Sequence, residues 1–208
     1  MKPITICIVG THQCGITKLS NLIRLMYEIM DKNIFCSWKI ESSELSALMK
    51  KKKYDAILCK VHDTSNSYLK KYNVVLLATR NVLDSALSGG EIKNDTSAKF
   101  YIKHCKNNIR LYNKFKAITD FIFRYENYNI QYITILSSLL NIKLSSNQIV
   151  NIMNDIDKMH PSNLPESYYT TDGISKTNRH MPKKKLKKML KDETISKFLK
   201  EHSYIEGL

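Results

Sequence analysis

ITICIVGTHQCGITKL, residues 4–19, joins a β-branched apolar run to a polar loop that contains two glycines. The run over residues 4–9 ends at Gly10 and has the composition of a strand buried on both faces of a sheet. After the loop, apolar side chains recur at the spacing of one helical face: Leu19, Leu22, Ile23, Met26 and Ile29. The stretch therefore predicts a strand, a tight loop and a helix in that order.

The rest of the chain continues this alternation. Further apolar runs predict strands at residues 33–40, 54–59, 73–79 and 118–123. Periodicity predicts helices at 44–52, 97–116, 128–140, 145–156 and 183–200, with a loop at 157–182. Strands that alternate with helices are typical of an α/β fold with a mostly parallel sheet. We therefore expect a single domain over residues 1–208, with three layers and a central sheet of about five strands flanked by helices.

Composition limits the class of protein. The 208 residues include 33 Lys and Arg against 19 Asp and Glu, a net charge of +14, and 43% are hydrophobic, which is typical of a folded globular protein. No apolar run reaches the roughly 18 residues of a membrane span, and no signal peptide is evident, so we expect a cytoplasmic protein. The abundance of Lys, Ile and Asn indicates an AT-rich genome, and codon bias is one interpretation of part of the charge.

The loop after the first strand has the G-x-x-x-x-G-x-T spacing of a P-loop, from Gly10 through Gly15 to Thr17. Glycines let such a loop turn its backbone N–H groups toward a phosphate, and the next helix adds its dipole. Ile16 occupies the position of the Walker lysine, which in nucleotide hydrolases reaches the β- and γ-phosphates. The loop therefore predicts phosphate binding without efficient nucleotide hydrolysis; the alternative is a strand-to-helix turn that binds no ligand.

Polar residues follow the other buried strands. Lys60 and His62 end the third strand, Arg80 ends the fourth, and Tyr125 with Glu126 ends the fifth. Ligands of parallel sheets bind at the carboxyl ends of the strands, so we expect these side chains to lie around the loop.

Five segments in this order resemble the motifs of the sulfotransferase family. Residues 8–19 resemble its 5′-phosphosulfate loop, and Lys60-Val61-His62 resembles its K-T-H motif. Residues 80–88 resemble its R-N-P-x-D-x-x-x-S motif, and residues 124–127 resemble its L-x-Y-E-D motif. Residues 173–208 begin with a stretch that resembles the basic C-terminal segment that closes over the donor nucleotide.

The resemblance implies a P-loop fold and sulfuryl transfer from 3′-phosphoadenosine 5′-phosphosulfate to a small-molecule or saccharide hydroxyl, without a metal. It implies His62 as the general base and Lys60 as the group that stabilises charge on the sulfuryl group. The implied donor-binding residues are Gln13, Cys14, Gly15, Ile16, Thr17 and Lys18 at the phosphosulfate, Arg80, Ser88 and Arg179 at the 3′-phosphate, and Tyr125 near the adenine.

The sequence also departs from the family pattern. Gln13 stands where the family has a lysine, and Met181-Pro182 replaces a glycine of the last segment. One alternative is a P-loop kinase-like phosphotransferase, against which the missing Walker lysine and the lack of a clear strand-end Asp for magnesium argue. Another is a non-catalytic nucleotide-binding or polyanion-binding protein.

Single residues have alternatives too. His62 is either oriented by Asp63 as a base or exposed in the polar loop 63–67, and Arg80 is either a ligand contact or a partner of Asp84. Tyr125 is equally well explained as a core aromatic. The lysine cluster 183–191 has three interpretations: it closes over the donor, it forms a solvated helix face, or it attracts an acidic polymer. Nucleic acid is an unlikely polymer, because no aromatic residues are interleaved with these lysines.

Overall fold

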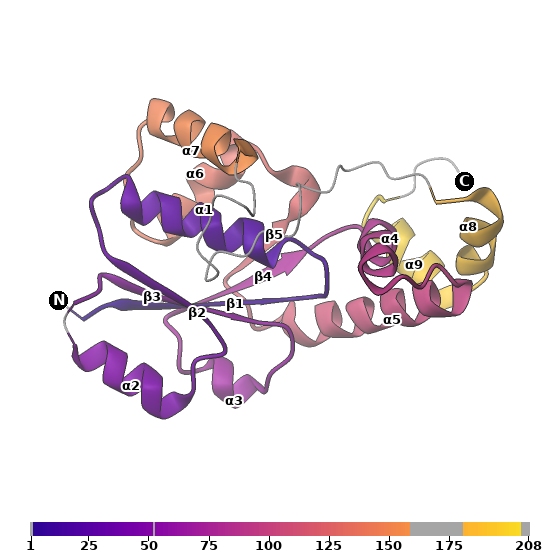
Figure 1. Cartoon of the computed structure of the whole chain (residues 1–208), viewed down its shortest axis with the longest axis horizontal. Coiled ribbons are helices and arrows are strands. Elements are labelled where there is room, and N and C mark those ends of the chain that lie inside the picture. The colour runs from indigo at the N-terminus through magenta and orange to yellow at the C-terminus, as the bar shows by residue number, and fades with distance from the viewer. Residues whose placement is uncertain (1, 52, 159–180, 205–208) are drawn as a thin grey trace.

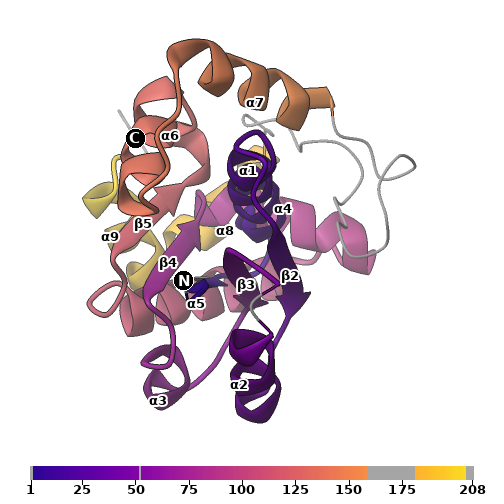
Figure 2. The same cartoon turned by 90° about the vertical axis from the view of Figure 1, so that its left-hand side faces the viewer.

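The computed structural model describes residues 2–51, 53–158 and 181–204. Its centre is a parallel five-stranded sheet in the order β2-β3-β1-β4-β5 (Figures 1 and 2). The strands are β1 (Ile4–Gly10), β2 (Ile34–Trp38), β3 (Ala56–Val61), β4 (Val74–Thr79) and β5 (Phe121–Arg124). The structure therefore confirms the predicted α/β class, the parallel sheet and its five strands.

Helices cover both faces of the sheet. On one face lie α1 (Ile16–Glu28), α6 (Ile130–Leu139) and α7 (Ser146–Lys158) (Figure 1). On the other lie α2 (Ser42–Lys50), α3 (Asn66–Leu69) and α5 (Ala98–Phe115), with α8 (Lys183–Leu190) and α9 (Glu193–Glu201) packed on α5. Helix α4 (Val82–Lys93) packs on α5 beyond the carboxyl end of β4, and η1 (Tyr125–Asn127) follows β5.

The alternation of side chains along the strands divides the interior into two cores. On β3, Ile57, Cys59 and Val61 belong to the core beneath α5, whereas Ala56 and Leu58 belong to the core beneath α1. Successive strand residues point to opposite faces, so Lys60 lies on the α1 side of the sheet, where the loop begins. Val9 of β1 pairs in register with Val61, which brings the two strand ends together.

The structure corrects several predicted boundaries. The helix expected at 183–200 is two helices, because the Asp192 carboxylate accepts a hydrogen bond from the Ile195 N–H at 3.4 Å and begins α9. The strand expected at 33–40 ends at Trp38, and Ser65 caps the short helix α3 within the expected polar loop. Residues 159–180, which include Arg179, lie outside the described residues. None of the described helices is both long and apolar enough to cross a bilayer.

Candidate functional site

The loop between β1 and α1 has a backbone shaped by two residues in the left-handed region. Gln13 has φ of 57° and Gly15 has φ of 88°. A Cβ on Gly15 would lie 3.1 Å from Cε2 of Tyr125 and still closer to Cδ2, so only glycine fits there. Backbone that alternates in this way, just before a helix N-terminus, presents N–H groups to an anion.

The side chains of this loop divide between the core and the open side. Cys14 and Ile16 are buried in the core beneath α1, and burial raises the pKa of the Cys14 thiol to about 12. Gln13 and Thr17 are half-buried. Cys14 and Ile16 can therefore contact a phosphate only through their backbone.

A buried polar network on the α5 side holds the loop in place. The Asn108 side chain, 1% exposed, accepts from the His12 N–H and donates to the His12 carbonyl, both at 3.1 Å. The Ser85 hydroxyl, on α4, also donates to the His12 carbonyl, at 2.5 Å, and lies 3.1 Å from Nε2 of His104. Asn108 completes the network by donating to Ser85 at 2.7 Å. Two helices therefore fix the backbone of one loop residue.

His62 lies beside the loop, and its ring is oriented by the backbone. Nδ1 of His62 is 3.2 Å from the carbonyl oxygen of Gly10, so Nδ1 carries the proton and Nε2 keeps its lone pair. Asp63 does not orient this ring; its carboxylate accepts from Lys114 at 2.5 Å and from Arg110 at 3.2 Å. The interpretation that Asp63 positions His62 is therefore wrong, and the Gly10 carbonyl takes that role.

Aromatic rings continue from His62 in both directions. The His12 ring centroid is 4.4 Å from that of His62, and His104 follows at 6.4 Å from His12. Burial lowers the pKa of all three histidines, that of His104 to about 4, and charge repulsion from His12 lowers those of His62 and His104 further. The gathering of three histidines was not predicted, because His12 and His104 meet only through the packing of α5.

Lys60 is the buried cation on this side. It is 2% exposed, and its Nζ lies 4.8 Å from the ring centroid of Trp38, which itself lies 5.4 Å from the His62 ring. Burial lowers the pKa of Lys60. Lys60, His62, His12 and Trp38 are called the base flank of the loop below.

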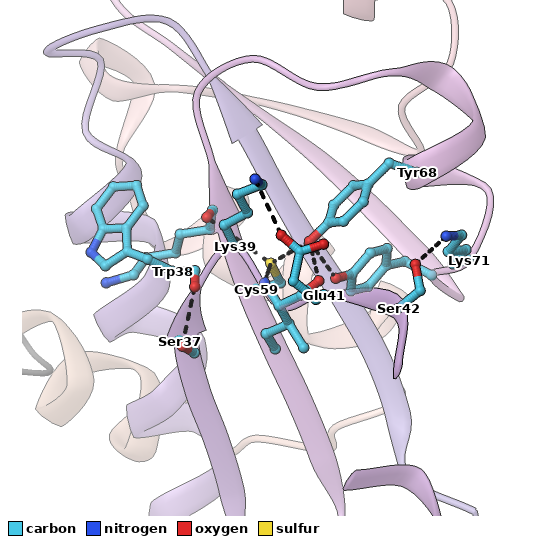
Figure 3. A network of polar contacts seen from close by, with 11 residues as sticks. Ser37, Trp38, Lys39, Glu41, Ser42, Cys59, Tyr68 and Lys71 are labelled. Atoms are coloured by element: carbon cyan, nitrogen blue, oxygen red, sulfur yellow. Dashed lines mark hydrogen bonds and ion pairs between the residues drawn. The ribbon is translucent and has the colours of Figure 1, made fainter. Parts of the chain in front are cut away.

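The turn after β2, which presents Trp38, is fixed by the contacts in Figure 3. The Ile40 N–H donates to Cys59 Sγ at 3.3 Å, and the Ile40 carbonyl accepts from the Tyr68 hydroxyl at 2.8 Å. Tyr68 also lies 3.2 Å from Cys59 Sγ, and Lys39 forms an exposed ion pair with Glu41 at 3.2 Å. The exposed indole therefore stands on a backbone with little freedom to move.

The opposite side of the loop combines cations with tyrosines. Arg80 is 3% exposed just past β4, and its Cζ lies 4.7 Å from the centroid of the Tyr125 ring, which packs on Gly15. Nζ of Lys18 lies 3.7 Å from the Tyr128 ring centroid and 5.0 Å from that of Tyr125. Arg80, Tyr125, Lys18 and Tyr128 are called the anchor flank below.

Glu126 braces the anchor flank. It follows Tyr125 in η1 and accepts from the Asn81 N–H at 2.6 Å, next to Arg80 in the chain. Burial raises the pKa of Glu126. Ser88 is buried one turn beyond Ser85 on α4. Among the described residues, no three His, Cys, Asp or Glu side chains form a group suited to a metal ion.

The structure thus gathers Lys60, His62, Arg80 and Tyr125 around the predicted loop. No family model matches the sequence, and no curated protein matches it. The solved structure of mouse sulfotransferase SULT7A1 complexed with PAP is similar, with a TM-score of 0.66 and 12% identity, over 96% of this chain and 89% of that one. Shikimate kinase from Bacteroides thetaiotaomicron gives a TM-score of 0.45 and 9% identity, over 66% of this chain and 98% of that one. The fold therefore resembles that of a sulfotransferase.

Proposed function

We propose that this protein transfers a sulfuryl group from 3′-phosphoadenosine 5′-phosphosulfate to an acceptor hydroxyl. The observation that carries the proposal is the pair of unlike flanks on one phosphate loop that has no Walker lysine. The base flank offers a ring nitrogen with a free lone pair and a buried ammonium, and the anchor flank offers a buried guanidinium over the Tyr125 ring.

The base flank suits removal of the acceptor proton. Because Nδ1 of His62 is directed at the Gly10 carbonyl, Nε2 is the atom that accepts the hydroxyl proton. The pKa of His62, lowered mainly by burial, keeps the ring neutral and ready at neutral pH. Lys60 lies two residues earlier on the same strand and supplies positive charge to the sulfuryl oxygens as they pass to the acceptor.

The anchor flank suits the bisphosphate end of the donor. A buried arginine at a strand end costs free energy unless anions surround it, and its planar fork matches a phosphate in two hydrogen bonds. The loop of Gln13 to Lys18 would hold the 5′-phosphosulfate through its N–H groups, and Tyr125 would border the adenine. The donor supplies the sulfuryl group and leaves as adenosine 3′,5′-bisphosphate. Arg179 and Ser88 remain proposed 3′-phosphate contacts.

Thermal unfolding with a panel of nucleotides tests the proposal. A ligand that binds only the folded protein adds about 2.7 kcal/mol at a concentration of 100 Kd, so the midpoint rises. Adenosine 3′,5′-bisphosphate should raise it far more than AMP does, with or without a magnesium chelator. Equal shifts from the two ligands would remove the donor assignment. A shift with ATP that a chelator abolishes would favour a kinase-like phosphotransferase, and no shift with any nucleotide would favour a non-catalytic protein.

A further inference from the structure

The positive charge of this protein is confined to two segments. Residues 98–116 contain six Lys and Arg and no Asp or Glu, and residues 181–204 contain eight against three. These segments therefore hold a net charge of +11 out of +14, and the remaining 19 basic and 16 acidic residues nearly cancel. Codon bias acts along the whole chain, so it does not explain a charge confined in this way.

Helix α5 displays its cations along one line. Lys99, Lys103, Lys106, Arg110 and Lys114 are all exposed or nearly so, and they recur every three or four residues. At 3.6 residues a turn and 1.5 Å a residue, this spacing gives a straight stripe about 22 Å long on one face of the helix. Asn108, which holds the phosphate loop, lies on roughly the opposite side of the same helix.

The second basic segment packs beside this stripe. Helices α8 and α9 contact α5, as Figures 1 and 2 show, and the Lys106 ammonium pairs with Asp192 at 3.0 Å. Nζ of Lys185 lies 5.5 Å from the Tyr101 ring of α5. The apolar side chains of α8, Leu186 and Met189 among them, pack into the core and leave its lysines outward. The stripe and the α8 lysines together are called the basic face.

The carboxylates near the stripe do not neutralise it. Asp63 is shared by Arg110 and Lys114, and Asp192 serves Lys106, so two acids face three cations. Exposed ion pairs of this kind contribute about 0–1 kcal/mol, so they yield readily to a denser anion.

We propose that the basic face binds a linear acidic polysaccharide. A row of point charges on a flat face suits a flexible chain that carries its anionic groups along its length. Among the described residues, Trp38 is the one exposed aromatic side chain, and it lies on β2, away from this face. Stacking of unpaired bases therefore has no platform here. Helix α5 is flanked by α4 and by α8 and α9, so it does not protrude far enough to enter a duplex groove.

Binding of the whole chain to size-defined heparin oligosaccharides, against a DNA duplex of matched charge, tests this proposal. The variant Lys99→Glu/Lys103→Glu removes two cations that pair with no other described residue, and Lys99 lies in the first turn of α5, where glutamate is favourable. Its control, Lys32→Glu/Lys70→Glu, changes the net charge equally at exposed positions outside the basic face. The neutral variant Lys99→Gln/Lys103→Gln serves if charge reversal disturbs folding.

We expect the stripe variant to weaken heparin binding by roughly tenfold at 0.1 M salt, and to lower the salt slope of log K by about 2. The control should change affinity by less than about twofold, since its charges do not belong to the basic face and exposed charges are screened by salt. Equal losses in the two variants, no heparin binding at 0.1 M salt, or tighter binding of the duplex would each overturn the proposal. The rise of the unfolding midpoint with adenosine 3′,5′-bisphosphate is measured on the same variants. This second measurement tests the proposed transfer reaction independently of heparin binding.

Discussion

The two flanks of the phosphate loop bury different kinds of nitrogen. The base flank holds two imidazole rings and the buried Lys60 ammonium, and desolvation lowers the pKa of His12, His62 and Lys60. The anchor flank buries Arg80, whose planar guanidinium carries several N–H donors in a fixed geometry. One side of the loop thus presents imidazole rings and an ammonium, and the other side presents a guanidinium packed on the Tyr125 ring. In the proposed reaction, one side of the loop accepts the proton and the other side binds the anionic donor.

Removal of the base should have the largest effect. His62→Ala should lower turnover by about 10²–10⁴-fold, because a positioned base contributes on that scale. The rise of the unfolding midpoint with the bisphosphate should be unchanged, because His62 lies on the base flank and the bisphosphate is proposed to bind at the anchor flank. His202→Ala on α9 is the matched control and should leave turnover unchanged. Normal turnover of His62→Ala would show that His62 on the base flank is not the general base.

Arg80→Ala tests the anchor flank. It should weaken bisphosphate binding by roughly 1.5–3 kcal/mol, about 10–150-fold, which is the contribution of a hydrogen bond to a charged group. Arg80→Lys should recover part of the affinity, because it restores the charge without the fork. Calorimetric titration gives both values. Arg110→Ala, on the exposed stripe of α5, should bind as the parent does, and a loss there equal to that of Arg80→Ala would contradict a local site.

Asn108→Ala should affect both flanks together. It removes the buried amide that pairs with both the N–H and the carbonyl of His12, so we expect a loss of about 1–3 kcal/mol in the free energy of unfolding. Because the loop lies between the flanks, bisphosphate affinity and turnover should both fall. Denaturant unfolding measures the first effect, and Asn113→Ala, exposed on the same helix, is the control. Unchanged affinity would mean that the loop keeps its shape without this clamp.

The variant Gln13→Lys adds a cation to the loop at the position where sulfotransferases have a lysine, and it should increase the chemical difference between the two flanks. We expect a rise in turnover of about tenfold, since one added charge in a partly buried site stabilises the transition state by roughly 1.4 kcal/mol. Gln131→Lys on α6 makes the same exchange at an exposed position and should change nothing. A fall in turnover would show that the left-handed backbone at Gln13 is already matched to glutamine.

The pH profile should give the smallest effect. His62 acts as a base only when neutral, and its pKa is lowered by burial and by His12. Activity should therefore persist below the ordinary imidazole value of about 6.5 and fall as the pH drops through the lowered pKa. His12→Ala removes one of the two causes, so the acid limb of kcat/KM should move to higher pH. A shift of the acid limb to lower pH would exclude charge repulsion between the His12 and His62 rings as a cause of the lowered pKa.

Local signals predicted the loop and the strand ends, and long-range packing decided the rest. The strand over residues 4–9, the two glycines and the charges at Lys60 and Arg80 are all visible in short stretches of sequence. Asn108 contacts His12 across 96 residues, and no periodicity marks a helical asparagine that faces a loop. The break before α9 had a signal, because Asp192 followed by Glu193 is typical of a helix start, but the lysine pattern concealed it.

The burial of Ile16 limits which substitutions this loop can accept. The loop is one residue away from a complete Walker motif, and the single exchange Ile16→Lys would complete it. In the folded protein that position belongs to the core beneath α1, beside Gly10 and Cys14. A lysine ammonium at this position would lose its hydration without gaining a phosphate partner. The Ile16→Lys variant would therefore be less stable than the parent protein. A Walker lysine in this loop would therefore require the core beneath α1 to change as well.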